Sequence, residues 1–177
     1  VNEVAGNYLA GRFGLRAPAA AFIDIPEDVT MSLMPEHQPQ YYNADPRLKF
    51  ASEELKDVKA FVHGLGKQVI GKKISTDTLY AFDNLIRNAD RGQQKPNLLL
   101  GKRDAYVIDH EFILSAVDIQ AVRFENYELD EKYTRYHIFH SYLQKARNKG
   151  KRFYFDEFSE YLRRTDFGGL IPLFDQM

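Results

Sequence analysis

Residues 75–110 constrain the fold more than any other part of this sequence. Apolar side chains recur there at helical spacing, at Leu79, Phe82, Leu85 and Ile86. Ser75 or Thr76 is suited to cap the start of that helix. Two short apolar runs follow, 98–100 and 105–108, separated by the polar turn 101–104. This pattern predicts a helix with one buried face, followed by a β-hairpin.

Three polar residues lie at the ends of these elements. Asp90 follows the helix, Asn97 precedes the first apolar run, and Asp109 follows the second. Asn97 and Asp109 would therefore lie on paired strands at the open end of the hairpin, where their oxygens could share a Mg²⁺ ion. Phosphoryl transfer needs such ligands and a residue that orients the attacking hydroxyl. Each residue alone has a turn or cap role as its alternative, whereas the joint arrangement favours a phosphotransferase site.

The same segments resemble a known family. NADR at 88–91, PNLLL at 96–100 and VIDH at 107–110 are similar to motifs of the kinase-like superfamily, most closely of the HipA-like kinase domains. The resemblance implies ATP and Mg²⁺ as cofactors, Asp90 as the catalytic-loop aspartate, Asn97 as a metal ligand, and Asp109 as the counterpart of the aspartate in D-F-G. Arg91 would hold the loop or the acceptor.

The acceptor is left open by the same comparison. The family resemblance implies a protein Ser or Thr hydroxyl and, in its toxin branch, an antitoxin partner that binds DNA. Asp90 followed by Arg91 also resembles the D-R-H loop of phosphoinositide kinases, so a lipid acceptor is an alternative. A pseudokinase or nucleotide-sensing interaction module without turnover is the further alternative.

The resemblance extends to the start of the chain. A helix there carries Glu3, which matches the glutamate that pairs the nucleotide-binding lysine in this family. Residues 19–25 and 29–34 are interpreted as two strands behind the nucleotide cleft, and Met34 as an adenine contact. The alternative for these apolar residues is an ordinary strand core.

These features together predict an α+β chain with a kinase-like fold, mainly its helical lobe. We expect residues 1–34 to form a remnant of the small lobe, 35–50 a connector, and 51–177 the helical lobe with the catalytic loop. A complete kinase places a glycine-rich hairpin and a lysine strand before the helix that carries Glu3. We therefore expect a segment of a longer polypeptide, inactive alone, which needs a small lobe in cis or from a partner in trans.

Further helices are predicted on both sides of the hairpin. One starts at Ser52, ends at Gly64–Gly66, and carries Leu55, Val58, Phe61 and Val62. Three others are predicted over 119–126, 130–148 and 155–164.

Composition excludes several classes of function. The 177 residues include no cysteine, which removes disulfides and thiol chemistry. The net charge of −1 implies no general attraction to nucleic acid or anionic membranes. The apolar runs are too short to span a bilayer, and Glu3 and Arg12 interrupt any signal-peptide core. We expect one globular domain located in the cytoplasm.

Two other clusters have ordinary explanations. His137 and His140 are spaced to share a helix face, and we interpret them as interfacial or partly exposed histidines in preference to zinc ligands. The basic residues between 145 and 152 could make a nucleic-acid-associated scaffold. A solvated helix end that complements the helix dipole is the preferred interpretation, so direct nucleic-acid binding is not expected.

Overall fold

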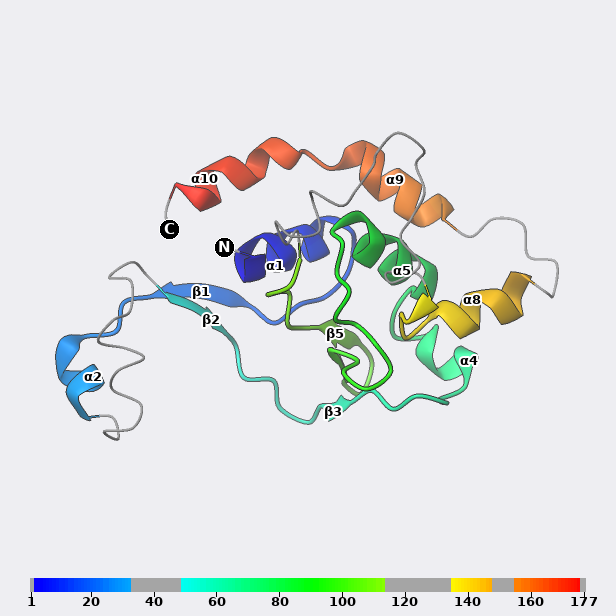
Figure 1. Cartoon of the computed structure of the whole chain (residues 1–177), viewed down its shortest axis with the longest axis horizontal. Helices are drawn as coiled ribbons and strands as arrows, with labels where there is room; N and C mark the ends of the chain where they lie inside the picture. Colours follow the sequence, from blue (N-terminus) through cyan, green and yellow to red (C-terminus); the bar gives the residue numbers. More distant parts are fainter. Residues whose placement is uncertain (1, 33–48, 114–134, 148–154, 176–177) are drawn as a thin grey trace.

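Helices and two small antiparallel sheets make up the computed structural model, which describes residues 2–32, 49–113, 135–147 and 155–175. This is the α+β composition expected from the sequence. Helix α1 (Asn2–Arg12) lies near the centre of the molecule in Figure 1, with the C-terminal helices along one side and the strands on the other. Three of its buried residues, Ala5, Leu9 and Ala10, are part of the main core.

Helix α5 (Thr76–Leu85) confirms the first expectation and corrects it in detail. Leu79, Phe82 and Ile86 are at most 2% exposed, but Leu85 is 38% exposed, so its assignment to the buried face is wrong. Successive residues of a helix are rotated by about 100° about its axis. Leu85, one position before Ile86, is therefore rotated away from the stripe that faces the core. Ser75 occupies the N-cap position without a side-chain bond to the helix backbone.

The predicted hairpin is present as β4 (Leu98–Leu100) and β5 (Ala105–Val107). The two strands are antiparallel, with Leu98 opposite Val107. Leu98 and Val107 are buried, which directs this face of the hairpin into the core. A short strand, β3 (Lys59–Ala60), pairs with the other edge of β4.

The predicted helix from Ser52 is wrong. Ser52 is the last residue of strand β2 (Lys49–Ser52), which pairs with β1 (Ala20–Ile23) so that Ala20 lies opposite Ser52. Residues 59–60 are in β3, and the next helix, α4 (Lys67–Ile70), begins only after Gly66. Strands β2 and β3 pair with β1 and β4, which are distant in the sequence. This pairing outweighs the helical spacing of the apolar residues, because tertiary contacts commonly override a weak local helix preference.

The second predicted strand, over 29–34, is also wrong. Residues 27–32 form helix α2 (Glu27–Ser32) instead, at the far end of the molecule in Figure 1. Pro26 precedes this helix and Glu27 and Asp28 open it, a combination that favours a helix start through the fixed φ of proline and the helix dipole. Met34 and the expected connector lie largely or wholly outside the described residues.

The C-terminal part is helical, as expected. It contains α8 (His140–Arg147), α9 (Asp156–Arg164), the 3₁₀ turn η2 (Phe167–Leu170) and α10 (Ile171–Phe174). The prediction over 155–164 is confirmed, whereas only the end of 130–148 is described and its helix begins at His140. The segment 119–126 lies outside the described residues. Phe158 of α9 stacks on Phe13 with ring centroids 5.2 Å apart, which joins α9 to the core.

None of the helices in the described ranges is both long and apolar enough to cross a bilayer.

Candidate active site

The residues predicted for the site come from the loop after α5 and from the open end of the hairpin. Asn97 lies directly before β4 and Asp109 two residues after β5, and the Ile108 amide donates to the Asn97 carbonyl at 3.1 Å. The Asn97 amide nitrogen donates to Oδ2 of Asp90 at 3.1 Å. The fold therefore brings Asp90, the predicted catalytic-loop aspartate, into direct contact with Asn97, the predicted metal-binding asparagine.

Asn97 and Asp109 share an uncommon backbone conformation. Their φ angles are +44° and +59°, in the left-handed region that side chains other than glycine adopt rarely. Asn and Asp tolerate this region best, because their short polar side chains bond locally. Such positions cost on the order of 1–3 kcal/mol and concentrate at functional sites. Both predicted metal ligands thus lie where the hairpin backbone is least relaxed.

Lys95 joins the two carboxylates. Its ammonium lies 2.7 Å from Oδ2 of Asp90 and 2.9 Å from Oδ2 of Asp109. The hydrogen bond to Asp90, followed by the one to Asp109, raises the pKa of Lys95 above its ordinary value. One cation therefore contacts both acidic groups, which shows that the site favours positive charge.

The donor set is suited to Mg²⁺ rather than to zinc. Asp109 and Asn97 supply oxygen atoms, and Mg²⁺ is commonly held by one or two protein groups together with water and substrate phosphates. Within the described ranges, no three His, Cys, Asp or Glu side chains are grouped for a metal ion. A site made by protein groups alone, such as structural zinc requires, is thus not found among these residues.

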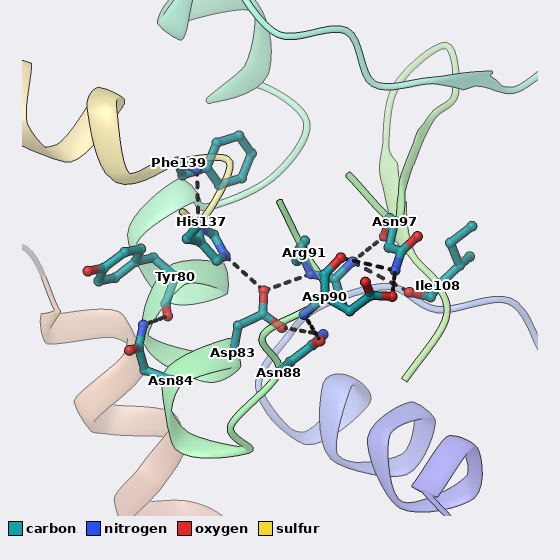
Figure 2. Close-up of polar contacts among 10 residues, drawn as sticks. All are labelled: Tyr80, Asp83, Asn84, Asn88, Asp90, Arg91, Asn97, Ile108, His137 and Phe139. Atoms are coloured by element: carbon teal, nitrogen blue, oxygen red, sulfur yellow. Dashed lines mark hydrogen bonds and ion pairs between the residues drawn. The ribbon is translucent and has the colours of Figure 1, made fainter. Parts of the chain in front are cut away.

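Asp83 of α5 lies beneath this cluster and is buried, with 1% exposure. Figure 2 shows its carboxylate between the catalytic loop and the segment that contains His137. It accepts from Nε of Arg91 at 2.7 Å, from the Asn88 amide at 3.1 Å and from Nε2 of His137 at 2.9 Å. Burial acts to raise the pKa of Asp83, but the charge of Arg91 and the bond from His137 outweigh it and lower the pKa.

Arg91 connects Asp83 to the hairpin. Its side chain is fully buried. Nη1 donates to the carbonyl of Asn97 and, at 3.5 Å, to the carbonyl of Ile108. The arginine thus contacts the backbone of one predicted metal ligand and that of the residue preceding the other (Figure 2). Of the two expected roles for Arg91, these contacts support holding the loop.

His137 is a buried residue, 4% exposed, and our interpretation of it as interfacial or partly exposed is wrong. It precedes α8, so it does not share a helix face with His140. Nδ1 accepts from the amide of Phe139 at 3.0 Å, which leaves the ring proton on Nε2, facing Asp83. Burial lowers the pKa of His137 despite the opposing effect of Asp83.

The sequence analysis missed three residues of this site, Lys95, Asp83 and His137. A signal existed for Asp83, because it lies on the buried stripe of α5, four residues after Leu79 and three before Ile86. A carboxylate on an apolar helix face is rarely buried without partners. His137 carried no comparable signal, since its partners are distant in sequence.

Glu3 lies near the site but contacts a different group from the one expected. Its Oε1 accepts from the backbone amide of His110 at 2.8 Å. Burial acts to raise the pKa of Glu3, but its bonds and charge interaction with His110 outweigh this and lower it. Helix α1 is therefore tied directly to the segment that follows Asp109.

A cavity of about 190 Å³ opens beside this contact. Its lining combines acidic groups, Glu3 and Asp109, with apolar side chains from both sheets, including Phe50 of β2 and Val107 of β5. The cavity is smaller than the roughly 300–1,000 Å³ of typical ligand pockets, and both polar and apolar residues line it. The predicted metal ligand Asp109 thus lies at the wall of a cavity.

The family comparison agrees with this geometry. A sequence model described as HipA-like kinase matches residues 1–162. The chain belongs to the HipA-like kinase family. No curated protein and no solved structure matches it. The match covers α1, both sheets, the Asp90 loop and the hairpin, so all the site residues described above lie within the family region of this HipA-like kinase.

Proposed function

We propose that this HipA-like kinase adopts a kinase-like fold and catalyses Mg²⁺-dependent transfer of the ATP γ-phosphoryl group to a protein Ser or Thr hydroxyl. The convergence of Asp90, Asn97 and Asp109, the last of which lines the cavity, carries the proposal. Membership of the kinase family supports nucleotide and metal use in general. ATP would bind at the cavity lined by Phe50 and Ile108, which has room for only part of the nucleotide, with its phosphates directed toward Asp109.

Each polar residue then has a distinct role. Asp109 and Asn97 would hold Mg²⁺, which neutralises charge on the phosphates. Asp90 would orient the acceptor hydroxyl and accept its proton as the new O–P bond forms and the bond between the γ-phosphorus and the ADP oxygen breaks. Asp90 is suited to this because it emerges from the loop held by Asn88 and Arg91, so its position is defined before the substrate binds.

A second candidate, a nucleotide-sensing module without turnover, rests on Lys95. Its ammonium already forms ion pairs with both carboxylates, so Mg²⁺ must compete with an internal cation. Glu3 is likewise engaged by the His110 amide in this structure. If Lys95 and Glu3 kept these partners in the nucleotide complex, the protein would bind ATP in an orientation unsuited to phosphoryl transfer.

The test compares three Asp variants in the native polypeptide. Asp109→Asn should weaken Mg·ATP binding most, because it removes a charged ligand. Asp90→Ala should leave ATP affinity near that of the wild type and lower turnover by about 10²- to 10⁴-fold. Asp104→Asn is the matched control, since Asp104 lies at the hairpin turn and pairs with Arg16 at the surface.

The measurements are isothermal titration with Mg·ATP and a radiolabelled-ATP assay with protein and phosphoinositide acceptors. Equal Mg·ATP affinity in wild type and Asp109→Asn would disprove the metal role of Asp109. Near-normal transfer by Asp90→Ala would disprove the role of Asp90. Binding without transfer to any acceptor in the wild type would favour the nucleotide-sensing module, and labelling of the lipid alone would change the acceptor class.

A further inference from the structure

Asp83 gathers donors from separate parts of the chain. Asn88 and Arg91 belong to the catalytic loop, whereas His137 lies 54 positions after Asp83. An ionised carboxylate is costly to bury unless its oxygens are well bonded. Here three donors satisfy it, and two of them, Asn88 and Arg91, are also bonded to residues at or next to the proposed reacting groups.

The first of these connections runs through Asn88. Its amide nitrogen donates to Asp83, and its Oδ1 accepts from the backbone amide of Asp90 at 3.1 Å. The amide side chain therefore has its donor and its acceptor used at once, which fixes its orientation. Displacement of Asp83 would release Asn88 and, with it, the backbone of Asp90.

The second connection runs through Arg91. Nε donates to Asp83, while Nη1 donates to the carbonyls of Asn97 and Ile108. The guanidinium is planar and rigid, so its contacts with Asp83 set where Nη1 lies. This buried side chain therefore links the catalytic loop to the hairpin end, in addition to the direct contact between Asn97 and Asp90.

His137 supports the same carboxylate from the other side. Its backbone forms a β-bridge with Gly92, and the Ile138 amide donates to the Arg91 carbonyl at 3.1 Å. The ring donates to Asp83 through Nε2. The segment 137–138 therefore contacts both the backbone of the catalytic loop and the carboxylate beneath it.

We infer that Asp83 and His137 are positioning residues for phosphoryl transfer, which hold Asp90 at its working distance from Asn97 and Asp109. The inference rests on the proposed function for its consequence in catalysis. Asp83 and His137 are 1% and 4% exposed, so neither side chain is placed to contact the acceptor or the nucleotide. Their effect must pass through Asn88 and Arg91.

Two His137 variants separate this role from simple packing. His137→Gln keeps a side-chain N–H donor at the reach of Nε2, whereas His137→Leu keeps similar bulk without a donor. His140→Leu is the matched control, because His140 is half-buried nearby and is not bonded to Asp83. Asp83→Asn is the direct test, but it leaves Arg91 buried beside a neutral group and is the variant at risk of unfolding.

Two readouts apply to every variant. One is kcat and the ATP KM in the native polypeptide. The other is amide hydrogen exchange at Asp90 and Ile138, with Val107 as a reference amide in β5. Amide hydrogen exchange reports how firmly the loop around Asp90 is held, even in a variant that has no activity.

The expected result is a selective loss. His137→Leu should lower kcat by about 10- to 100-fold with little change in KM, since small displacements of reacting groups have effects of this size. Asp90 and Ile138 should exchange about tenfold faster while Val107 is unchanged, because opening would be local. His137→Gln should restore most of both properties, and a folded Asp83→Asn should behave like His137→Leu.

Contrary results separate this inference from the proposed function. Normal kcat and normal exchange in His137→Leu would overturn the positioning role while leaving the proposed function in place. An equal loss in His137→Gln and His137→Leu would reduce His137 to packing and overturn it as well. If the wild type neither binds nor transfers phosphate, the proposed function fails, and exchange at Asp90 still decides whether Asp83 and His137 hold the loop.

Discussion

The close approach of α1 to the residue after Asp109 gives a sharp test of the structure. Gly6 is buried on α1, and a Cβ placed there would lie 2.3 Å from Cβ of His110 and 2.5 Å from its Cγ. Gly11 lies on the same helix, is exposed, and has open space where its Cβ would be. Alanine substitution at the two positions therefore adds the same methyl group to the same helix in opposite surroundings.

The expected magnitudes follow from two effects. Replacing glycine by alanine in a helix contributes about 0.8–1 kcal/mol of stability, so Gly11→Ala should be stabilising by roughly that amount. The same gain at Gly6 is opposed by overpacking, which costs about 1–3 kcal/mol and is expected near the upper limit here because the contacted atoms are close to the backbone. Gly6→Ala should therefore be net destabilising by about 2 kcal/mol.

The assay is thermal and denaturant unfolding of both variants beside the wild type. A difference of about 3 kcal/mol between them corresponds to roughly 6–12 °C in Tm for a chain of this size. Gly6→Ala should also weaken Mg·ATP binding, because relief of the clash separates Glu3 from the His110 amide next to Asp109. A Gly6→Ala protein as stable as Gly11→Ala would refute the packing of α1 against His110.

Three further predictions concern the core, acid stability and the metal. Leu79→Ala should lose about 2–5 kcal/mol of unfolding free energy. Leu85→Ala should lose far less, because Leu85 on the same helix is 38% exposed. Equal losses in denaturant titrations would contradict the orientation of α5. The pKa of Asp83 is lower in the folded protein than in the unfolded chain, so its stabilising contribution is present above the ordinary Asp pKa of about 3.9 and is lost as pH falls through the folded value. Unfolding free energy should therefore fall less steeply on acidification in Asp83→Asn than in wild type, and parallel curves would count against this. Lys95→Met should bind Mg²⁺ more tightly than wild type in titration calorimetry, because it removes the cation that bridges the two carboxylates. Lys102→Met at the hairpin turn is the control. Unchanged Mg²⁺ affinity in Lys95→Met would exclude competition between Lys95 and Mg²⁺.

Local elements were predicted well where their signal lies within a few residues. The helix after Ser75 and the hairpin over 98–108 were both recovered, because side-chain periodicity and a short polar turn are sufficient to define them. The helix over 155–164 was predicted within one residue of its start for the same reason. The family motifs lie in and between these elements, so they too were readable from the sequence.

Long-range pairing was not readable in this way. The strand that ends at Ser52 requires β1, whose first residue lies 32 positions earlier, and nothing in the local sequence specifies that partner. Residues 59–60 likewise become a strand only because β4 offers them an edge. Segments whose conformation depends on a distant partner are those where local preference is a weak guide.

The order of residues along the chain specifies which groups are available to the site: Asp90 in the loop after a helix, then Asn97 and Asp109 at the open end of a hairpin. Their surroundings depend on how the chain packs. Asp83 meets His137 across 54 positions and Glu3 meets the His110 amide across 107, contacts that arise because burial forces polar groups to find partners wherever the chain brings them. A carboxylate enclosed in the core has few possible positions once its donors are fixed, and this is why the packing, rather than the motif, defines the arrangement of the site.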